Sequence, residues 1–153
     1  MTNNIRYLAN VLIIDDSRVD SAFLAQLLES FGCHVDLCSS GYDAVQRLDK
    51  KYELVFLDIN MPDLNGYEIA NGLKNFGKQI YSTPLILISG EDFSREMEEK
   101  CIQLKVEGYI QKPIKKDELQ MILQAFLRHY EIEMFAGHNG SHNARGFIKK
   151  VQA

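Results

Sequence analysis

Five runs of consecutive apolar residues, separated by longer segments with helical spacing, constrain the fold of this chain more than any other feature. We expect each run to form a strand: residues 11–15, 35–40, 54–58, 85–89 and 108–113. A strand with one wet face alternates apolar and polar residues, whereas a continuous apolar run suits a strand buried on both faces. The second run is more polar and is expected to be half-buried. The sequence therefore predicts a parallel sheet covered by helices on both sides.

The segments between these runs have the period of amphipathic helices. We expect helices at residues 17–31, 42–48, 67–76, 91–104 and 115–130. The last is the clearest, because Leu119, Ile122 and Leu123 recur at helical spacing. Strand and helix alternate five times, which predicts an α/β fold with a doubly wound, five-stranded parallel sheet flanked by five helices.

The composition fits one globular domain in a reducing compartment. Of the 153 residues, 46% are hydrophobic and 25% are charged, and the net charge of −4 argues against a nucleic-acid partner. Cys33, Cys38 and Cys101 show no CxxC spacing and are expected to be buried, reduced thiols. No apolar stretch is long enough for a signal peptide or a membrane span, so we expect a cytoplasmic protein without a transmembrane segment.

Polar residues occur where the predicted strands end. Asp15 and Asp16 end the first strand, Asp58 ends the third, Ser89 the fourth and Lys112 the fifth. In a parallel sheet these ends lie along one edge, which is where open α/β folds bind ligands. A single terminal Asp is more often a helix cap or a turn residue. Five polar groups on one predicted edge instead indicate a binding crevice.

The residue types at this edge point to phosphoryl chemistry. Three carboxylates that lie close together repel one another and need a cation, and such oxygen ligands suit Mg²⁺, with Mn²⁺ as the alternative. Lys112 can hold a phosphate oxygen as a point charge, and the Ser89 hydroxyl can donate one more hydrogen bond. Together these groups predict a site where an aspartate accepts a phosphoryl group.

Four stretches resemble the receiver domain of two-component response regulators, in the CheY-like superfamily. They are LIIDDSRVD, LVFLDINMPDLNGYE, LILISGE and GYIQKPIKKDEL, in this order along the chain. The resemblance covers residues 9–130, as one receiver domain, and implies a flavodoxin-like fold with strand order 2-1-3-4-5. Residues 131–153 are polar and rich in glycine, and we expect them to form a flexible tail or a short docking segment.

The resemblance assigns roles to the acidic residues of the crevice. Asp58 would be the phosphoacceptor. Asp15 and Asp16 would hold Mg²⁺ together with Asp58, and the backbone carbonyl of Asn60 would complete the protein ligands. The metal site and the phosphoacceptor site would therefore share one carboxylate.

The resemblance also implies how the remaining motif residues take part. Ser89 and Lys112 would bind the phosphoryl group after transfer, and Ser89 would act with Tyr109 as a switch in which the aromatic ring swings inward. The Lys112–Pro113 peptide bond would be cis, which is a form that proline permits. Gly66 would let the loop after the phosphoacceptor turn tightly.

The function that the resemblance implies is that of a single-domain response regulator in a two-component phosphorelay. A sensor histidine kinase or a histidine phosphotransfer protein would donate the phosphoryl group. The chain would not be a turnover enzyme, although it would promote its own phosphorylation and dephosphorylation. Phosphorylation would switch the face formed by the fourth helix, fifth strand and fifth helix, which would bind a downstream protein or a second copy of the chain.

Three alternatives stay open. The first is a receiver fragment of a larger output protein. The second is a phosphotransferase of the haloacid dehalogenase type, which places a general-acid Asp two residues after its nucleophile. This chain has Asn60 there, and an amide cannot protonate a leaving group. The third, a receiver-like module that never accepts phosphate, is disfavoured by the complete set of acids.

Overall fold

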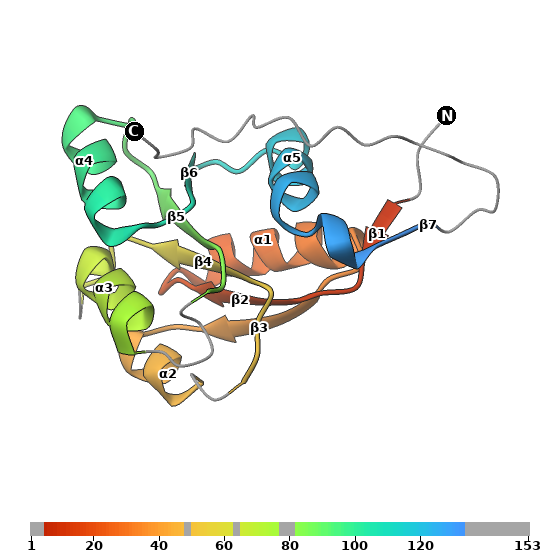
Figure 1. The fold of residues 1–153 in the computed structure, drawn as a ribbon, viewed down its shortest axis with the longest axis horizontal. Coiled ribbons are helices and arrows are strands. Elements are labelled where there is room, and N and C mark those ends of the chain that lie inside the picture. Colours follow the sequence, from red (N-terminus) through yellow and green to blue (C-terminus); the bar gives the residue numbers. More distant parts are fainter. Residues whose placement is uncertain (1–4, 48–49, 63–64, 77–81, 134–153) are drawn as a thin grey trace.

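A five-stranded parallel sheet forms the centre of the molecule (Figure 1). The computed structural model describes residues 5–47, 50–62, 65–76 and 82–133. The strands of the sheet are β2 (Asn10–Ile14), β3 (His34–Cys38), β4 (Leu54–Asp58), β5 (Leu85–Ser89) and β6 (Gly108–Gln111). Their spatial order is β3-β2-β4-β5-β6, and every neighbouring pair is parallel. Counted along the chain this is the order 2-1-3-4-5, so the predicted fold and strand order are confirmed.

Five helices cover the sheet in two layers (Figure 1). One layer holds α1 (Arg18–Ser30) and α5 (Lys116–Phe126), and the other holds α2 (Gly41–Gln46), α3 (Gly66–Phe76) and α4 (Arg95–Leu104). Alternate residues of each strand enter opposite hydrophobic clusters. In β2, Val11 and Ile13 belong to the cluster under α1 and α5. Leu12 and Ile14 belong to the cluster under the other three helices.

Strand β4 shows why the apolar runs are continuous. Leu54, Val55, Phe56 and Leu57 are completely inaccessible to solvent, because each face of the strand meets a layer of helices. Burying one such side chain contributes about 1.5–3 kcal/mol to folding. Asp58 ends this strand and is itself buried, with 4% of its surface exposed. A buried carboxylate is stable only with partners, and the arrangement of those partners defines the site described below.

The helix limits lie within two residues of the prediction except at one end of two helices. Helix α4 begins at Arg95, later than expected, because the Ser94 hydroxyl accepts a hydrogen bond from the Met97 amide at 3.2 Å and caps the helix there. Helix α5 ends at Phe126 and is followed by a short 3₁₀ turn at Arg128–Tyr130. Within the described ranges, no helix combines the length and the apolar character needed to cross a membrane.

The three cysteines are buried and unpaired, as predicted. Burial raises the pKa of Cys33 to about 12 and the pKa of Cys101 to about 11. Thiols held this far from ionisation are poor nucleophiles and poor metal ligands. Their contribution is therefore to packing.

A small antiparallel sheet joins the two ends of the described chain, and the sequence did not predict it. Strand β1 (Ile5–Tyr7) pairs with β7 (Glu131–Glu133). The Tyr7 amide also donates to the Phe31 carbonyl at 2.8 Å, which ties β1 to the end of α1. Strands of three residues are too short to show a period of two. The fold therefore extends past both predicted limits, residues 9 and 130, and the rest of the predicted tail, 134–153, lies outside the described residues.

Candidate functional site

Two buried aspartates lie at the ends of adjacent central strands. Asp15 directly follows β2 and Asp58 is the last residue of β4, and their side chains are 2% and 6% exposed. The turn after each strand holds the carboxylate in place. The Asp15 carboxylate accepts from the Ser17 amide at 2.9 Å, and the Asp58 carboxylate accepts from the Asn60 amide at 2.7 Å. The prediction that these strand ends meet at one edge is thus correct.

The predicted metal ligands form one cluster. Asp15, Asp16 and Asp58 each offer a carboxylate oxygen, and these three atoms lie within 4.8 Å of one another. Asp16 is the exposed member of the cluster, and Asp15 and Asp58 are buried. Oxygen ligands at this spacing, with room for water, fit Mg²⁺. The predicted fourth ligand, the carbonyl of Asn60, stays a prediction.

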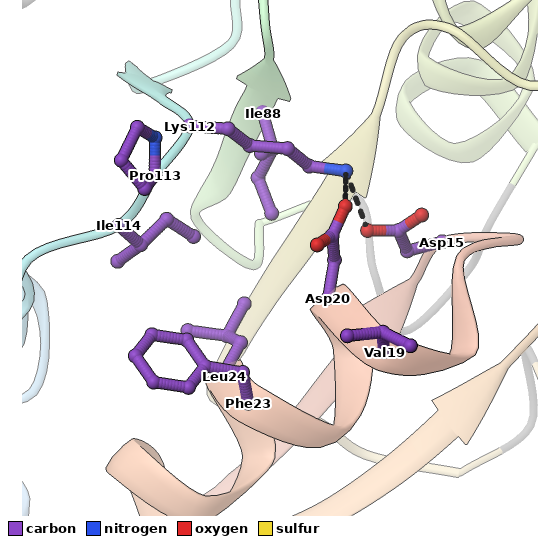
Figure 2. A pocket seen from close by; sticks show the side chains of 9 residues that line it. All are labelled: Asp15, Val19, Asp20, Phe23, Leu24, Ile88, Lys112, Pro113 and Ile114. Carbon is purple, nitrogen blue, oxygen red and sulfur yellow. Dashed lines mark hydrogen bonds and ion pairs between the residues drawn. The ribbon is translucent and has the colours of Figure 1, made fainter.

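Lys112 brings the positive charge to this cluster. Its ammonium donates to Asp58 at 2.8 Å, to Asp20 at 2.9 Å and to Asp15 at 3.0 Å. Figure 2 shows the side chain reaching across the crevice to Asp15 and Asp20. Burial opposes the charge of Lys112, but the hydrogen bonds to the three carboxylates outweigh it and raise the pKa of the ammonium. The Lys112–Pro113 bond is cis, as predicted.

Asp20 is a functional candidate that the sequence analysis missed. It lies in the first turn of α1, where acidic residues are common because they complement the helix dipole. The hydrogen bond from Lys112 lowers the pKa of the Asp20 carboxyl, so this group is ionised at neutral pH. A helix that starts directly after the strand carrying Asp15 must place its first turn beside the crevice. That placement is the signal that could have identified Asp20.

The pH dependence of Mg²⁺ binding follows from Asp15. Burial raises the pKa of its carboxyl to about 6, against the opposing effect of the Ser17 and Lys112 hydrogen bonds. A metal ligand must be deprotonated, so protons compete with Mg²⁺ below this pKa. We expect the Mg²⁺ affinity to fall roughly tenfold between pH 7 and pH 5. Calorimetric titration at several pH values measures this fall, and an affinity unchanged at pH 5 would contradict it.

The two predicted switch residues contact one loop. Ser89 is fully buried, and its hydroxyl accepts from the Glu91 amide at 3.0 Å and from the Asn60 side-chain amide at 3.3 Å. Tyr109 is also buried, and its hydroxyl donates to the Glu91 carbonyl. Its ring lies 4.7 Å from the Phe93 ring, centroid to centroid. Ser89 and Tyr109 are thus both hydrogen-bonded to the backbone of Glu91, while the switch itself stays a prediction.

Gly66 is required for a reason other than the one predicted. Its φ lies outside the left-handed region, so the tight turn does not depend on glycine's torsional freedom. The first residue of α3 instead packs directly against the chain after β4. A Cβ on Gly66 would lie 2.3 Å from the Ile59 Cα and 2.8 Å from the Asp58 carbonyl oxygen. Glycine is needed here for space.

An apolar pocket of about 160 Å³ opens beside the Lys112 side chain (Figure 2). Its lining combines three charged residues of the crevice with apolar residues of α1, β5 and the segment after β6: Asp15, Asp20, Lys112, Val19, Phe23, Leu24, Ile88, Pro113 and Ile114. Val19 is 79% exposed and Phe23 is 52% exposed. Apolar side chains this exposed beside a reactive crevice form a surface suited to a protein partner.

Comparison with known sequences gives matches over most of the chain. A sequence model of the response regulator receiver domain matches residues 11–124. The hybrid signal transduction histidine kinase L of Dictyostelium discoideum is 29% identical over 145 residues, which are 91% of this chain and 8% of that protein. This chain spans between 8% and 19% of the length of the first curated relatives that it matches.

Solved structures show the same fold. Chemotaxis protein CheY4 of Vibrio cholerae superposes with a TM-score of 0.73 at 25% identity, over 78% of this chain and 99% of that one. The receiver domain of the sensor histidine kinase PA1611 from Pseudomonas aeruginosa gives a TM-score of 0.70 at 26% identity, over 79% and 98%. The latter structure has a magnesium ion coordinated in its active-site cleft.

Proposed function

The chain belongs to the response regulator receiver domain family, and from this premise we propose that Asp58 accepts a phosphoryl group from a phosphohistidine. The donor is a sensor histidine kinase or a histidine phosphotransfer protein. One observation carries the proposal: the Asp58 carboxylate is fixed by the Asn60 amide and Lys112 while its oxygen lies within 4.8 Å of ligand atoms of Asp15 and Asp16. This arrangement presents one carboxylate to a phosphoryl donor and surrounds it with groups that bind charge.

The transfer needs no group from the chain other than those described. An oxygen of the Asp58 carboxylate attacks phosphorus and forms an O–P bond, while the N–P bond of the donor breaks and its electron pair stays on the imidazole. Lys112 donates hydrogen bonds to the phosphoryl oxygens as their charge redistributes. Asp15, Asp16 and Asp58 would hold Mg²⁺, which would supply charge neutralisation and alignment. The same groups would serve dephosphorylation, in which water attacks phosphorus, the P–O bond to Asp58 breaks, and inorganic phosphate leaves with the Asp58 carboxylate restored.

Phosphorylation would bias a protein surface. The new phosphoryl group adds roughly −1.5 to −2 charges at the sheet edge. Ser89 would move toward it and shift the loop at Glu91, to which Tyr109 is bonded. The face of α4, β6 and α5 would change with that loop, and a downstream protein or a second copy of the chain would bind it. This output is compatible with a separate response regulator and with a receiver module of a longer protein.

The proposal favours a phosphoacceptor over a turnover enzyme. A dehalogenase-type phosphotransferase needs an acid two residues after Asp58, and Asn60 there has no acidic proton. The Asn60 side chain instead donates to the hydroxyl of Ser89, the residue that would hydrogen-bond the phosphoryl group after its transfer to Asp58. We also propose a cytoplasmic location, which the free, buried thiols support because such thiols persist in reducing compartments.

The phosphoacceptor is tested by intact mass after incubation with acetyl phosphate and Mg²⁺. We expect a mass increase of one phosphoryl group, which disappears when Mg²⁺ is chelated and when Asp58 is replaced by Asn. Binding of beryllofluoride, an acyl-phosphate mimic, tests the same site without turnover. Absence of both the adduct and beryllofluoride binding would reject the proposed function, and an equal adduct on Asp58→Asn would reject the residue.

Docking of the donor protein is tested by substituting the exposed apolar residues of the pocket beside Lys112. Val19 and Phe23 are exposed at the pocket beside Lys112, so we propose that a donor protein whose phosphohistidine reaches Asp58 covers them. We expect the double variant Val19→Ala, Phe23→Ala to slow phosphotransfer from a donor protein by about tenfold or more. Phosphorylation by acetyl phosphate should be unchanged. Leu8→Ala is the matched control, since Leu8 is 62% exposed and precedes β2 at the opposite end of the sheet.

A further inference from the structure

We propose that Asp20 is a positioning residue that sets the charge of the crevice through Lys112, strengthening Mg²⁺ binding and weakening phosphoryl binding. This inference rests on the proposed function, since it concerns the same crevice. Acidic residues are common in a first helical turn, but that position alone does not account for a contact between Asp20 and Lys112. The observation that points to it is the 2.9 Å contact between the Asp20 carboxylate and the Lys112 ammonium.

The donors of Lys112 are fully engaged. An ammonium has three N–H donors, and the three carboxylates of Asp15, Asp20 and Asp58 lie 2.8 to 3.0 Å from its nitrogen. A phosphoryl oxygen on Asp58 can therefore bind Lys112 only if one of its N–H groups leaves the carboxylate to which it now donates. Asp15 and Asp58 belong to the metal cluster and are nearly inaccessible, whereas Asp20 lies outside that cluster with a side chain that is 50% exposed. Asp20 is thus the competitor that the phosphoryl group must partly displace.

Charge balance gives the direction of the effect. The four carboxylates of Asp15, Asp16, Asp20 and Asp58 and one ammonium carry a formal charge of −3 when all are ionised, that is, four negative charges and one positive. Additional negative charge attracts a divalent cation and repels a phosphoryl dianion. Asp20 therefore acts with opposite sign on the two ligands. A structural role in folding would move both affinities in the same direction.

Asp20 is not needed to keep Lys112 in the crevice. Lys112 has two other anchors, and its backbone amide donates to the Ser89 carbonyl at 2.8 Å. The helix cap is a hydrogen bond from the Asp20 backbone amide to the Ser17 hydroxyl, and a change of the Asp20 side chain leaves that backbone donor in place. Replacing the carboxylate by an amide keeps its shape, removes its charge and leaves one oxygen that can still accept from Lys112. Asp20→Asn is therefore a specific test.

The experiment measures two binding constants on the same protein by calorimetry. For Asp20→Asn we expect Mg²⁺ to bind roughly two- to fivefold more weakly, and beryllofluoride at saturating Mg²⁺ to bind tighter by a similar factor, as suits a partly exposed ion pair. Asp20→Glu, which restores the charge, should return toward the parent protein. Glu29→Gln is the matched control, because Glu29 is an exposed carboxylate near the far end of the same helix. Both differences should shrink as salt is added.

The outcomes separate this inference from the proposed function. If the parent protein binds beryllofluoride and Asp20→Asn binds it equally or more weakly, Asp20 does not compete for Lys112 and the inference is wrong. The inference also fails if Glu29→Gln reproduces both shifts, since net charge alone would then explain them. If the parent protein itself neither binds beryllofluoride nor forms an acyl phosphate, the proposed function fails first. A folding defect is recognised by thermal unfolding, and Asp20→Glu then carries the comparison.

Discussion

Replacing Lys112 by methionine is expected to slow the phosphorylation of Asp58 by acetyl phosphate by roughly two to three orders of magnitude. The Lys112 ammonium is already 2.8 Å from the Asp58 carboxylate, and its side chain is only 21% exposed. A charge held in place before the reaction stabilises the developing charge on the phosphoryl oxygens without first reorganising. Methionine has a similar length and fills the same space, but it has no donor. The rate of adduct formation by mass spectrometry measures the loss.

The same substitution should act in the opposite direction on Mg²⁺. Without Lys112 the carboxylates of Asp15, Asp20 and Asp58 lose their shared cation, so Mg²⁺ should bind more tightly. The metal-free protein should also become less stable, by about 3–5 kcal/mol if the buried carboxylates stay ionised. Lys115→Met is the control, because Lys115 is exposed and its substitution changes the net charge equally. An unchanged phosphorylation rate in Lys112→Met would remove Lys112 from the mechanism.

The crevice was predictable because the sheet is parallel. Once the apolar runs were assigned to parallel strands, topology alone required Asp15, Asp58 and Lys112 to meet at one edge, however far apart they lie in the chain. The identity of the partners within that edge was also readable, since buried carboxylates need a cation. These inferences depend on parallel strand direction, which the alternation of strands and helices predicts, and on residue type, which the sequence states directly.

Other features depend on distances that a sequence does not carry. In the sequence Asp20 is an ordinary acidic residue in a first helical turn. Only the structure shows that the Lys112 side chain extends across the crevice and donates to it. The β1–β7 pair consists of three-residue strands from opposite ends of the described chain, so neither strand has a local pattern. Gly66 was expected to let the loop turn tightly, but its need for space was not predicted, because a close approach between two backbone segments leaves no mark on the residues that make it.

Replacing Gly66 by alanine is expected to destabilise the protein more than the addition of a methyl group at any other glycine near the site. The new Cβ would lie 2.3 Å from the Ile59 Cα, which is backbone and cannot turn away. Helix α3 must then move away from the end of β4. This movement would strain the hydrogen bond that the Gly66 amide donates to the Ile59 carbonyl at 3.3 Å. We expect a loss of about 3 kcal/mol in the free energy of unfolding, at the upper end for overpacking. Urea denaturation measures it.

Gly72→Ala is the matched control, because it adds the same methyl group to the same helix. Apart from the adjacent backbone of its own helix, a Cβ at Gly72 would meet no atom within 4 Å, so this substitution should stabilise the protein by about 0.5–1 kcal/mol through helix propensity. Opposite signs for the two stability changes would separate the contact at Gly66 from any general effect on α3.

Gly66→Ala should also weaken Mg²⁺ binding while the protein remains folded, since the displaced segment includes Asp58 itself. Equal stability of Gly66→Ala and the parent protein would show that α3 can shift without cost, and the close packing would then not be what fixes the phosphoacceptor.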